Sequence, residues 1–512
     1  MVLIRRREKK DRPPSLRSGV VGDLVAGLSV ALVLIPQSLA YAELAGVPAH
    51  VGLYAAALPP IVAAIFVSSP YLQTGPTAIA SLLTFGALSS VAPLFSPRYI
   101  ALASLLALFV GLVRLVVGLA RGGALVYLLS QTVLTGFISA AALIIIAGQI
   151  PTVFGVEAPD GGVFERFGWV LTHPASWNAS SLLFAVATIA IVFGARRVHA
   201  FFPGVLLAVV LAAGYSAAFG YAGPRVGAVP TALPTISLDL PWNALPTLVL
   251  SGLVIALVGF AEPAAIARTF AAQDRSRWNP NAEFVSQGAA NIVAGLVGGF
   301  PVGGSIARSA LNRAMGARTR WSGATTGVAM LAFLPFAAVL APLPKAVLGA
   351  VVVTAVAPLV QPGPLRLLWS YSKPQFYIAL GTFLLTLWFT PHVERAVMLG
   401  VLLAVVVHLW RELTLEVQEW SEEGTLHLKP VGVLWFGTAA ALEEKLPSLL
   451  NRHPEARRLV IHFDGLGRVD LSGALAIRTF LLNARAAGIQ VEIADVPPQT
   501  QRVVQSVFGD YI

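Results

Sequence analysis

The sequence predicts an all-α membrane domain of fourteen transmembrane segments, followed by a small α/β domain. Of the 512 residues, 56% are hydrophobic and only 12% are charged. Apolar runs of about 20 residues, long enough to cross a bilayer as a helix, recur from Val20 to about Leu409. Beyond Trp410 charged residues return. Strand-like runs (TLHLKPVGVLWF, RRLVIHFDG and IQVEIADV) then alternate with helical ones (AAALEEKLPSLLNR and SGALAIRTFLLNARAAG).

Polar, proline-rich and charged interruptions divide the apolar region into fourteen candidate spans. We read the first run as a retained helix rather than a signal peptide, because no small-residue cleavage site is evident. The predicted spans cover residues 20–42, 51–68, 75–91, 99–119, 124–149, 180–195, 201–220, 246–267, 284–299, 303–315, 324–341, 345–361, 375–390 and 395–410.

Basic residues are distributed unequally between the loops that join these spans. With the N-terminus inside, twelve fall in cytoplasmic loops and five in external ones, which is the positive-inside pattern. Topology and anionic lipid explain the net charge of +10, including the basic tail over residues 1–18, so no nucleic-acid partner is expected. We therefore predict a multi-pass protein of the cell (inner) membrane with both termini cytoplasmic. The external residues are Arg98, Arg166, Arg225, Lys345 and Arg395, and the cytoplasmic ones are Arg114, Arg121, Arg196, Arg197, Arg268, Arg275, Arg277, Arg313, Arg318, Arg320, Arg366 and Lys373.

The residue types needed for metal or covalent chemistry are sparse. The chain has no cysteine, and no pair of histidines has metal-ligand spacing on a helix. No cluster of nucleophile, base and orienting residue is visible in the sequence. We therefore expect no metal, no cofactor and no enzymatic activity.

Two stretches containing proline and glycine interrupt otherwise apolar spans: TGPTAIAS over Thr74–Ser81 and PVGGSIARS over Pro301–Ser309. Fourteen spans divide into two sets of seven, and an odd number per set gives the second set an inverted topology. The two stretches then fall in the third span of each set, where inverted-repeat transporters place discontinuous helices. Each stretch taken alone could instead be a kink or a close-packing point of a membrane helix.

The directions of these two spans predict an anion site. Each segment enters the membrane as extended chain, and its helix starts near the midplane, at Thr77 or Ala78 in one and near Ser305 in the other. Each helix N-terminus carries about +0.5 of an elementary charge and free N–H groups, and broken backbone at this depth implies a cavity. Arg308 adds a full positive charge, which suits a dianion better than chloride.

Three stretches resemble the signature of the sulfate permease (SulP) family, the bacterial relatives of the animal anion carriers that include prestin and pendrin. They are VLIPQSLAYAELAGVPAHVGLYAAALPP from Val33, TGPTAIASLL from Thr74, and GGFPVGGSIARSALN from Gly298. With the C-terminal tail, the resemblance covers nearly the whole chain. It implies a seven-plus-seven inverted repeat, in which spans 1–4 and 8–11 form a core that moves like an elevator against a gate of spans 5–7 and 12–14. It also implies a homodimer.

The resemblance further implies which residues line the site. Gln37 and Tyr41 of the first span contribute side chains. The two broken segments contribute mainly backbone, with Arg308 beside it. The implied residues of the broken segments are Gly75, Pro76, Thr77, Ala78, Gly304, Ser305, Ile306, Ala307 and Arg308.

Two carboxylates within the membrane spans are candidates for ion coupling, because such groups are costly in lipid. Glu43 follows Pro36 in the first span, and Glu262 lies deep in the eighth. A carboxylate in a low-dielectric site beside an anion takes up a proton more readily than one in water, which favours proton symport. Alternatively, Glu43 is an interfacial residue at the outer lip, and Glu262 is a structural partner of an arginine or of backbone amides.

After a linker at residues 411–423, the segment 424–512 resembles the STAS domain that ends most proteins of this family, while residues 19–410 form the transporter domain. The stretch VDLSGALA at Val469–Ala476 corresponds to its Asp-x-Ser-Gly loop. In anti-sigma antagonists with this domain the loop serine is phosphorylated, which makes Ser472 a regulatory candidate. The simpler reading makes Ser472 a helix N-cap and Asp470 a loop acceptor.

The sequence thus predicts a secondary transporter, by proton-coupled symport, of a divalent anion such as sulfate or a C4-dicarboxylate like fumarate. Sodium-coupled bicarbonate symport, an uncoupled or exchanging carrier, and a channel or electromotive protein of the same fold remain open. A nucleobase carrier is disfavoured by Arg308 and by the STAS-like tail.

Overall fold

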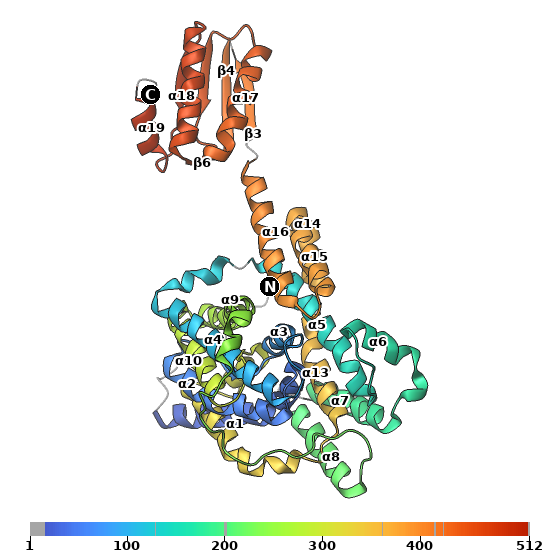
Figure 1. Ribbon diagram of the computed structural model, residues 1–512. Helices are drawn as coiled ribbons and strands as arrows, with labels where there is room; N and C mark the ends of the chain where they lie inside the picture. Colours follow the sequence, from blue (N-terminus) through green and yellow to red (C-terminus); the bar gives the residue numbers. More distant parts are fainter. Residues whose placement is uncertain are drawn as a thin grey trace, which may run out of the picture. The chain divides into compact units, whose positions relative to one another are not determined.

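The computed structural model describes residues 16–128, 130–198, 202–360, 362–413, 416–422 and 424–509. The first fifteen residues of the predicted basic tail lie outside the described part. The chain divides into two compact units, Met1–Val401 and Leu402–Ile512, the first built from helices and the second from a sheet with helices (Figure 1). Each unit has its own hydrophobic core.

The first unit is helical, with two very short strands that belong to the site described below. All fourteen predicted spans overlap one of its helices. Its helices are α1 (Leu16–Ala45), α2 (Ala49–Phe66), α3 (Ala78–Leu88), α4 (Pro97–Leu119), α5 (Gln131–Phe154), α6 (Val163–Thr172), α7 (Ala179–Val198), α8 (Gly204–Phe219), α9 (Leu245–Gln273), α10 (Pro280–Leu296), α11 (Ile306–Ala314), α12 (Trp321–Phe333), α13 (Lys345–Val356), α14 (Pro362–Tyr371), α15 (Lys373–Trp388) and α16 (Val393–Leu413), the last of which runs on into the second unit.

Some boundaries differ from the prediction. The span expected at 124–149 is wrong at its start, because Gly122–Leu128 is 3-10 helix and α5 begins only at Gln131, where the Ser130 side chain accepts a hydrogen bond from the Thr132 amide. Helices α6 and α14 were not expected at all. Within the described residues, nine helices are long and apolar enough to cross a membrane, so the exact count of fourteen spans stays a prediction.

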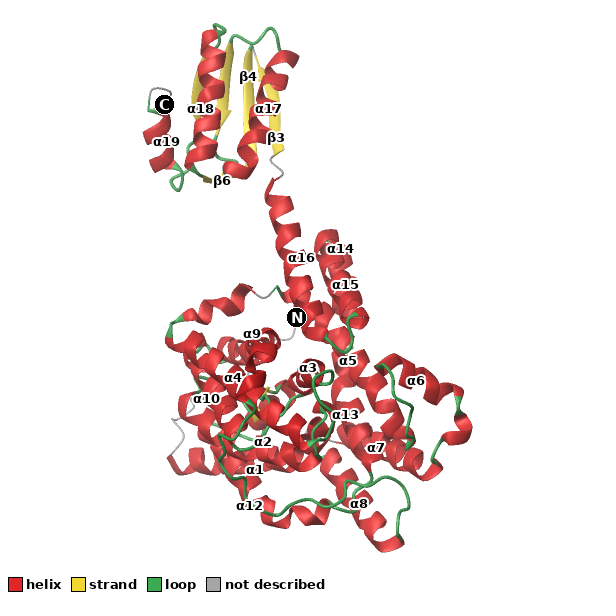
Figure 2. Cartoon of the chain, in the orientation of Figure 1, coloured by secondary structure: helices red, strands yellow, loops and turns green. Residues whose placement is uncertain are grey.

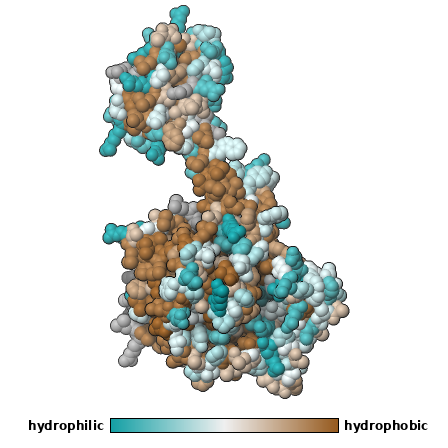
Figure 3. All heavy atoms as spheres, in the orientation of Figure 1, coloured by the Kyte–Doolittle hydropathy of each residue, from teal (hydrophilic) through white to brown (hydrophobic). Residues whose placement is uncertain are grey.

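Part of the surface of the first unit is strongly apolar. In Figure 3 a large hydrophobic area covers the left part of the visible face of this unit, whereas the right part is more polar. A soluble protein rarely leaves contiguous apolar area of this extent in water, so these side chains fit contact with lipid. Examples that are more than 60% exposed are Val116, Leu119, Leu183, Phe219 and Trp388.

The helices of the first unit pack in two groups. In one group, α10 packs against α2 and α4, α12 packs against α1 and α2, and α9 packs against α3 and α4. In the other, α5 packs against α13 and α15, while α7 packs against α8 and α13. Contacts of α1 with α8 and α13, and of α3 with α5, connect the groups. Whether these groups are a moving core and a fixed gate stays a prediction.

The second unit is a mixed sheet covered by helices. Its strand order is β3-β4-β5-β7, with β6 paired to β4. Strands β3 and β4 are antiparallel, and the other pairs are parallel. Helices α17 and α18 lie side by side over one face (Figure 2). The elements are β3 (Glu416–Glu422), β4 (Thr425–Leu434), α17 (Phe436–Arg452), β5 (Arg458–His462), β6 (Leu466–Val469), α18 (Leu471–Ala486), β7 (Gln490–Ala494) and α19 (Gln501–Phe508).

The sequence predicted three of these strands and the helices α17 and α18. It missed β6, α19 and β3, which occupies most of the segment expected as a linker. The N-cap of α18 is also corrected: Asp470, not Ser472, caps the helix, and its Oδ1 accepts a hydrogen bond from the Gly473 amide at 2.7 Å. Ser472 lies exposed in the first turn.

Candidate functional site

Two broken segments meet in the first unit, as the sequence predicted. Strand β1 (Thr74–Gly75) pairs antiparallel with β2 (Gly303–Gly304), with Thr74 opposite Gly304. Helix α3 then begins at Ala78 and α11 at Ile306. Thr77 and Ser305 are the N-cap residues: Thr77 Oγ1 accepts from the Ala80 amide at 3.3 Å, and Ser305 Oγ accepts from the Arg308 amide at 3.5 Å.

We call the paired strands β1 and β2 the crossing. Further hydrogen bonds extend it. The Ser305 amide donates to the Gln73 carbonyl at 3.1 Å, and the Gln73 amide donates to Ser309 Oγ at 3.0 Å. Non-helical backbone inside a membrane protein needs such internal partners, because lipid supplies none. The crossing therefore fixes both helix starts relative to each other.

Helix α10 supports the crossing with buried polar side chains that the sequence analysis did not consider. Gln287 Nε2 donates to Thr74 Oγ1 at 2.8 Å. Asn291 accepts from the Val302 amide at 2.9 Å and donates to the Val302 carbonyl at 3.0 Å. Glu283, Gln287 and Asn291 recur every fourth residue and are fully buried, so this polar stripe on an apolar helix was a readable signal.

At two positions of the crossing, Gly75 and Gly304, the backbone geometry or the close packing favours glycine. Gly75 has a φ of +154°, a backbone conformation that residues with a side chain rarely adopt. A Cβ on Gly304 would lie 2.6 Å from Leu72 Cδ1 and 3.2 Å from Pro263 Cβ. The close approach of the strand to α9 therefore makes a side chain at Gly304 unfavourable.

The helix starts open into a cavity of about 530 Å³. It brings together most of the predicted site residues, although they come from four helices that are far apart in the sequence. Gly75, Pro76 and Gly304 belong to the crossing and do not line it. The predicted residues that do line it are Gln37 and Tyr41 of α1, Thr77 and Ala78 of α3 and its cap, Glu262 of α9, and Ser305, Ile306, Ala307 and Arg308 of α11 and its cap.

Arg308 is the positively charged side chain at the crossing. It is only 1% exposed. Its Nη1 donates to Gln37 Oε1 at 3.4 Å, whereas Nε and Nη2 find no hydrogen-bond partner among the described residues. A Cβ on Gly75 would lie 3.5 Å from Arg308 Nη2, so the guanidinium lies against the β1 backbone. Two unused donors on a buried cation leave capacity to bind an anion.

Glu262 of α9 caps the N-terminus of α11. Its Oε1 accepts a hydrogen bond from the Ile306 amide, the first residue of α11, at 3.3 Å. A carboxylate at this place is stabilised by the helix dipole. It also occupies one of the N–H donors that an anion would use.

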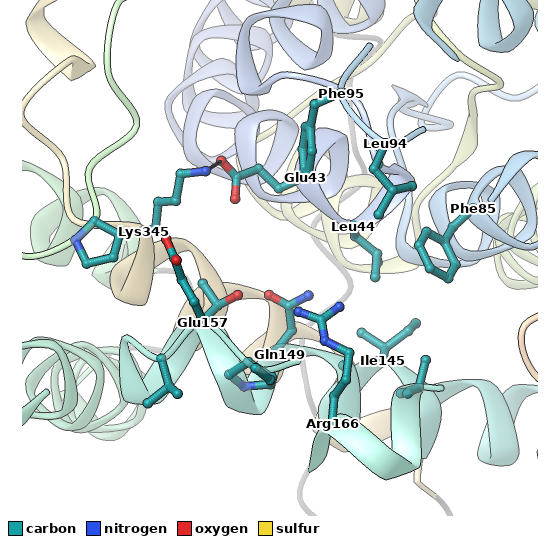
Figure 4. A pocket seen from close by; sticks show the side chains of 18 of the residues that line it. Glu43, Leu44, Phe85, Leu94, Phe95, Ile145, Gln149, Glu157, Arg166 and Lys345 are labelled. Atoms are coloured by element: carbon teal, nitrogen blue, oxygen red, sulfur yellow. Dashed lines mark ion pairs between the residues drawn. The ribbon is translucent and has the colours of Figure 1, made fainter. Parts of the chain in front are cut away.

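Glu43 does not line this cavity. It lies in a second pocket of about 590 Å³, where its Oε1 is 3.2 Å from Lys345 Nζ (Figure 4). Gln149 and Arg166 lie on the facing wall of this pocket. Lys345 was assigned to the external side by the loop charges, so this position fits the alternative reading of Glu43 as an interfacial residue at the outer lip.

Fold and site together define a class: a helical membrane protein with two broken helices at a buried cation, joined to a STAS domain. The sulfate permease family model matches residues 20–382, and the STAS domain model matches residues 420–508. The chain belongs to the sulfate permease family, whose named members are transporters rather than enzymes.

Individual relatives agree with this assignment. The chain is 34% identical to a probable sulfate transporter of Mycobacterium tuberculosis, over 70% of this chain and 65% of that protein. It is 29% identical to the chloroplastic sulfate transporter 4.1 of Arabidopsis thaliana, over 92% of this chain and 75% of that protein. Among solved structures, the murine Solute Carrier 26 family member A9 anion transporter has a TM-score of 0.89 at 20% identity, covering 97% of this chain and 89% of that chain. This last likeness shows the fold.

Proposed function

We propose that this protein is a secondary transporter of small anions that binds its substrate between the N-termini of α3 and α11. One observation carries the proposal: two helix starts, fixed by the β1–β2 crossing, open into one cavity beside the unused donors of Arg308. Helix N-termini and a buried guanidinium are both suited to bind oxyanions.

The charge of the site supports a divalent substrate. Each helix start contributes about +0.5, and Arg308 contributes +1. With Glu262 ionised, the sum is about +1, whereas with Glu262 protonated it is about +2. A dianion such as sulfate or fumarate therefore matches the site best when Glu262 carries a proton.

Because the charge of the site depends on whether Glu262 is protonated, proton binding and anion binding are linked. An ionised Glu262 holds the Ile306 amide and repels the incoming anion. Protonation removes the repulsion and frees that amide to bind the substrate. A bound dianion in turn favours the protonated form of Glu262. Glu262 is thus our proposed coupling residue for proton symport.

Alternating access would use the two helix groups. The cavity is lined by Arg196, which the loop charges place on the cytoplasmic side, and the second pocket is lined by Lys345, which they place outside. We propose that the described state faces inward. We also propose that the group containing α1, α3 and α9, together with α11, which packs against α1 and α9, moves like an elevator against the other group. Assembly as a homodimer in the inner membrane, with both termini cytoplasmic, belongs to the same proposal.

The proposal is tested by uptake into proteoliposomes that contain the purified protein. Radiolabelled sulfate, fumarate and bicarbonate are supplied separately, each with an imposed proton gradient or an imposed sodium gradient. We expect saturable uptake of a divalent anion that is driven by an inward proton gradient. Glu262→Gln should abolish the response to the proton gradient, and the matched variant Glu43→Gln should retain it.

Other outcomes point to other functions. Uptake driven only by sodium would replace proton coupling with sodium symport. Saturable exchange without any gradient dependence would indicate an uncoupled carrier, and ohmic anion flux would indicate a channel. No anion flux or binding at all would contradict the proposed function.

A further inference from the structure

A second buried arginine, Arg114 of α4, lies outside the cavity. It is 1% exposed, and its hydrogen bonds all go to backbone carbonyls. Nε donates to Ala256 at 2.9 Å and Nη2 to Ile255 at 3.0 Å, both on α9, and Nη1 donates to Val302 at 3.1 Å. Within the described part of the chain, Arg114 forms no ion pair.

Close backbone contacts connect Arg114 to the anion site. A Cβ on Gly259 of α9 would lie only 2.8 Å from Arg114 Nη2. A Cβ on Gly303 would lie 3.6 Å from the Gly259 carbonyl oxygen and 3.7 Å from Thr77 Oγ1. The backbone of α9 at Gly259 therefore lies between the Arg114 guanidinium and the anion site, at β2 and the start of α3.

We propose that Arg114 is a positioning and specificity residue of the anion site. It holds the Val302 carbonyl, and with it the strand that leads into Ser305 and α11. Its uncompensated charge also adds positive potential to the cavity, which favours a divalent over a monovalent anion. This inference rests on the proposed anion binding, and it assigns a role to a residue that does not contact the substrate.

The charge argument follows from the cost of burying an ion. A buried cation without a counter-ion is unfavourable, and carbonyl dipoles offset only part of the cost. An anion in the neighbouring cavity would offset more of it. Since the Coulomb attraction is proportional to the ligand charge, Arg114 favours sulfate about twice as strongly, in free energy, as a monovalent anion.

The positioning argument is separable from the charge argument. The planar guanidinium reaches three carbonyls on two segments at once, whereas a lysine ammonium is a point charge on a flexible stem. Arg114→Lys therefore keeps the charge but loses the planar set of donors that reaches all three carbonyls. Arg114→Met loses both while filling similar space with an apolar chain.

The experiment measures binding of sulfate and nitrate to the full-length protein in detergent by isothermal titration calorimetry, which is independent of transport coupling. For Arg114→Met we expect the ratio of sulfate to nitrate affinity to fall about tenfold. For Arg114→Lys we expect both affinities to fall together, with the ratio within about threefold of wild type. Arg98→Met, an exposed position on the same helix, is the matched control and should bind as wild type does.

A milder variant covers the case in which Arg114→Met does not fold. Arg114→Gln removes the charge but keeps an amide that can donate to these carbonyls, so it should lower the sulfate-to-nitrate ratio as Arg114→Met does. An unchanged ratio in Arg114→Met or Arg114→Gln, in folded protein, overturns the specificity role. A loss of ratio in Arg114→Lys equal to that in Arg114→Met overturns the charge argument. If the wild type binds neither anion, the proposed function itself fails.

Discussion

The carboxylate of Glu43, at the end of α1, lies 3.2 Å from the ammonium of Lys345, the first residue of α13. The ammonium also lies 5.7 Å from the centre of the Phe95 ring, so an acid and an aromatic ring contact the same cation. Because α1 and α13 belong to different helix groups, this pair joins the two groups at one of their few contacts. The charge of Glu43 is already compensated there, away from Arg308.

We expect Glu43→Gln to weaken the contact between the groups without weakening anion binding. The side chains of Glu43 and Lys345 are 16% and 34% exposed, and partly exposed ion pairs contribute about 0.2–1 kcal/mol. Thermal unfolding of the purified protein should shift slightly, and sulfate affinity should stay within about threefold of wild type. The exchanged pair Glu43→Lys with Lys345→Glu should restore the melting temperature. Loss of proton-driven uptake in Glu43→Gln, with Glu262→Gln still coupled, would reverse our assignment of the two carboxylates.

Arg308→Gln should weaken anion binding strongly. A hydrogen bond to a charged group contributes about 1.5–3 kcal/mol, so the loss corresponds to an affinity about 10- to 150-fold lower. Arg308→Lys should lie between wild type and Arg308→Gln, because the charge remains and the planar fork is lost. Calorimetric titration with sulfate measures both, and Arg313→Gln, at a partly buried cation on the same helix that does not line the cavity, is the control. Equal affinities for Arg308→Gln and wild type would remove Arg308 from the site.

The broken helices could be predicted from the sequence because their signals are local. Gly75, Pro76 and the N-cap residues Thr77 and Ser305 act within a few residues of their own position, and they fixed both helix starts to within a residue or so. The composition change after Trp410 likewise predicted a second domain, since it needs no knowledge of packing.

The parts that escaped prediction depend on partners far away in the chain. Glu43 was a coupling candidate because it is a carboxylate within a predicted span. Nothing near it in the sequence indicates that Lys345 is its partner. Arg114 looked like a loop charge at the end of a span, and only the packing of α4 against α9 shows that it is buried. Strand β3 was missed for the same reason, because its pairing with β4 outweighs the charged composition of Glu416–Glu422.

The glycines of β2 should differ in their tolerance of a methyl group. A Cβ on Gly304 would meet Leu72 at 2.6 Å and the rigid ring of Pro263 at 3.2 Å, whereas a Cβ on Gly303 would find no other heavy atom nearer than 3.6 Å. Gly304→Ala should therefore displace β2 and lower sulfate affinity about tenfold or more, with a cost of about 1–3 kcal/mol for overpacking. Gly303→Ala should have a clearly smaller effect in the same titration. Equal effects of the two variants would contradict this account of the crossing.

The cap of α18 predicts how the STAS domain responds to substitution in its Asp-x-Ser-Gly loop. Asp470 joins two helix starts, because Oδ1 accepts from the Gly473 amide at 2.7 Å and Oδ2 accepts from the Phe436 amide at 3.1 Å. Asp470→Ala should destabilise both starts by about 1 kcal/mol, the usual cost of losing an N-cap. Hydrogen exchange in the full-length protein should then quicken in the first turns of α17 and α18.

Ser472→Ala is the matched variant, because Ser472 is exposed and one residue beyond the start of α18. It should leave hydrogen exchange near wild type. A phosphate on Ser472 would lie at the positive end of the helix, so the phosphomimetic Ser472→Asp should slow exchange in the first turn of α18. Faster exchange in Ser472→Asp, or equal exchange in Asp470→Ala and wild type, would show that the loop does not cap the helix in the way the geometry indicates.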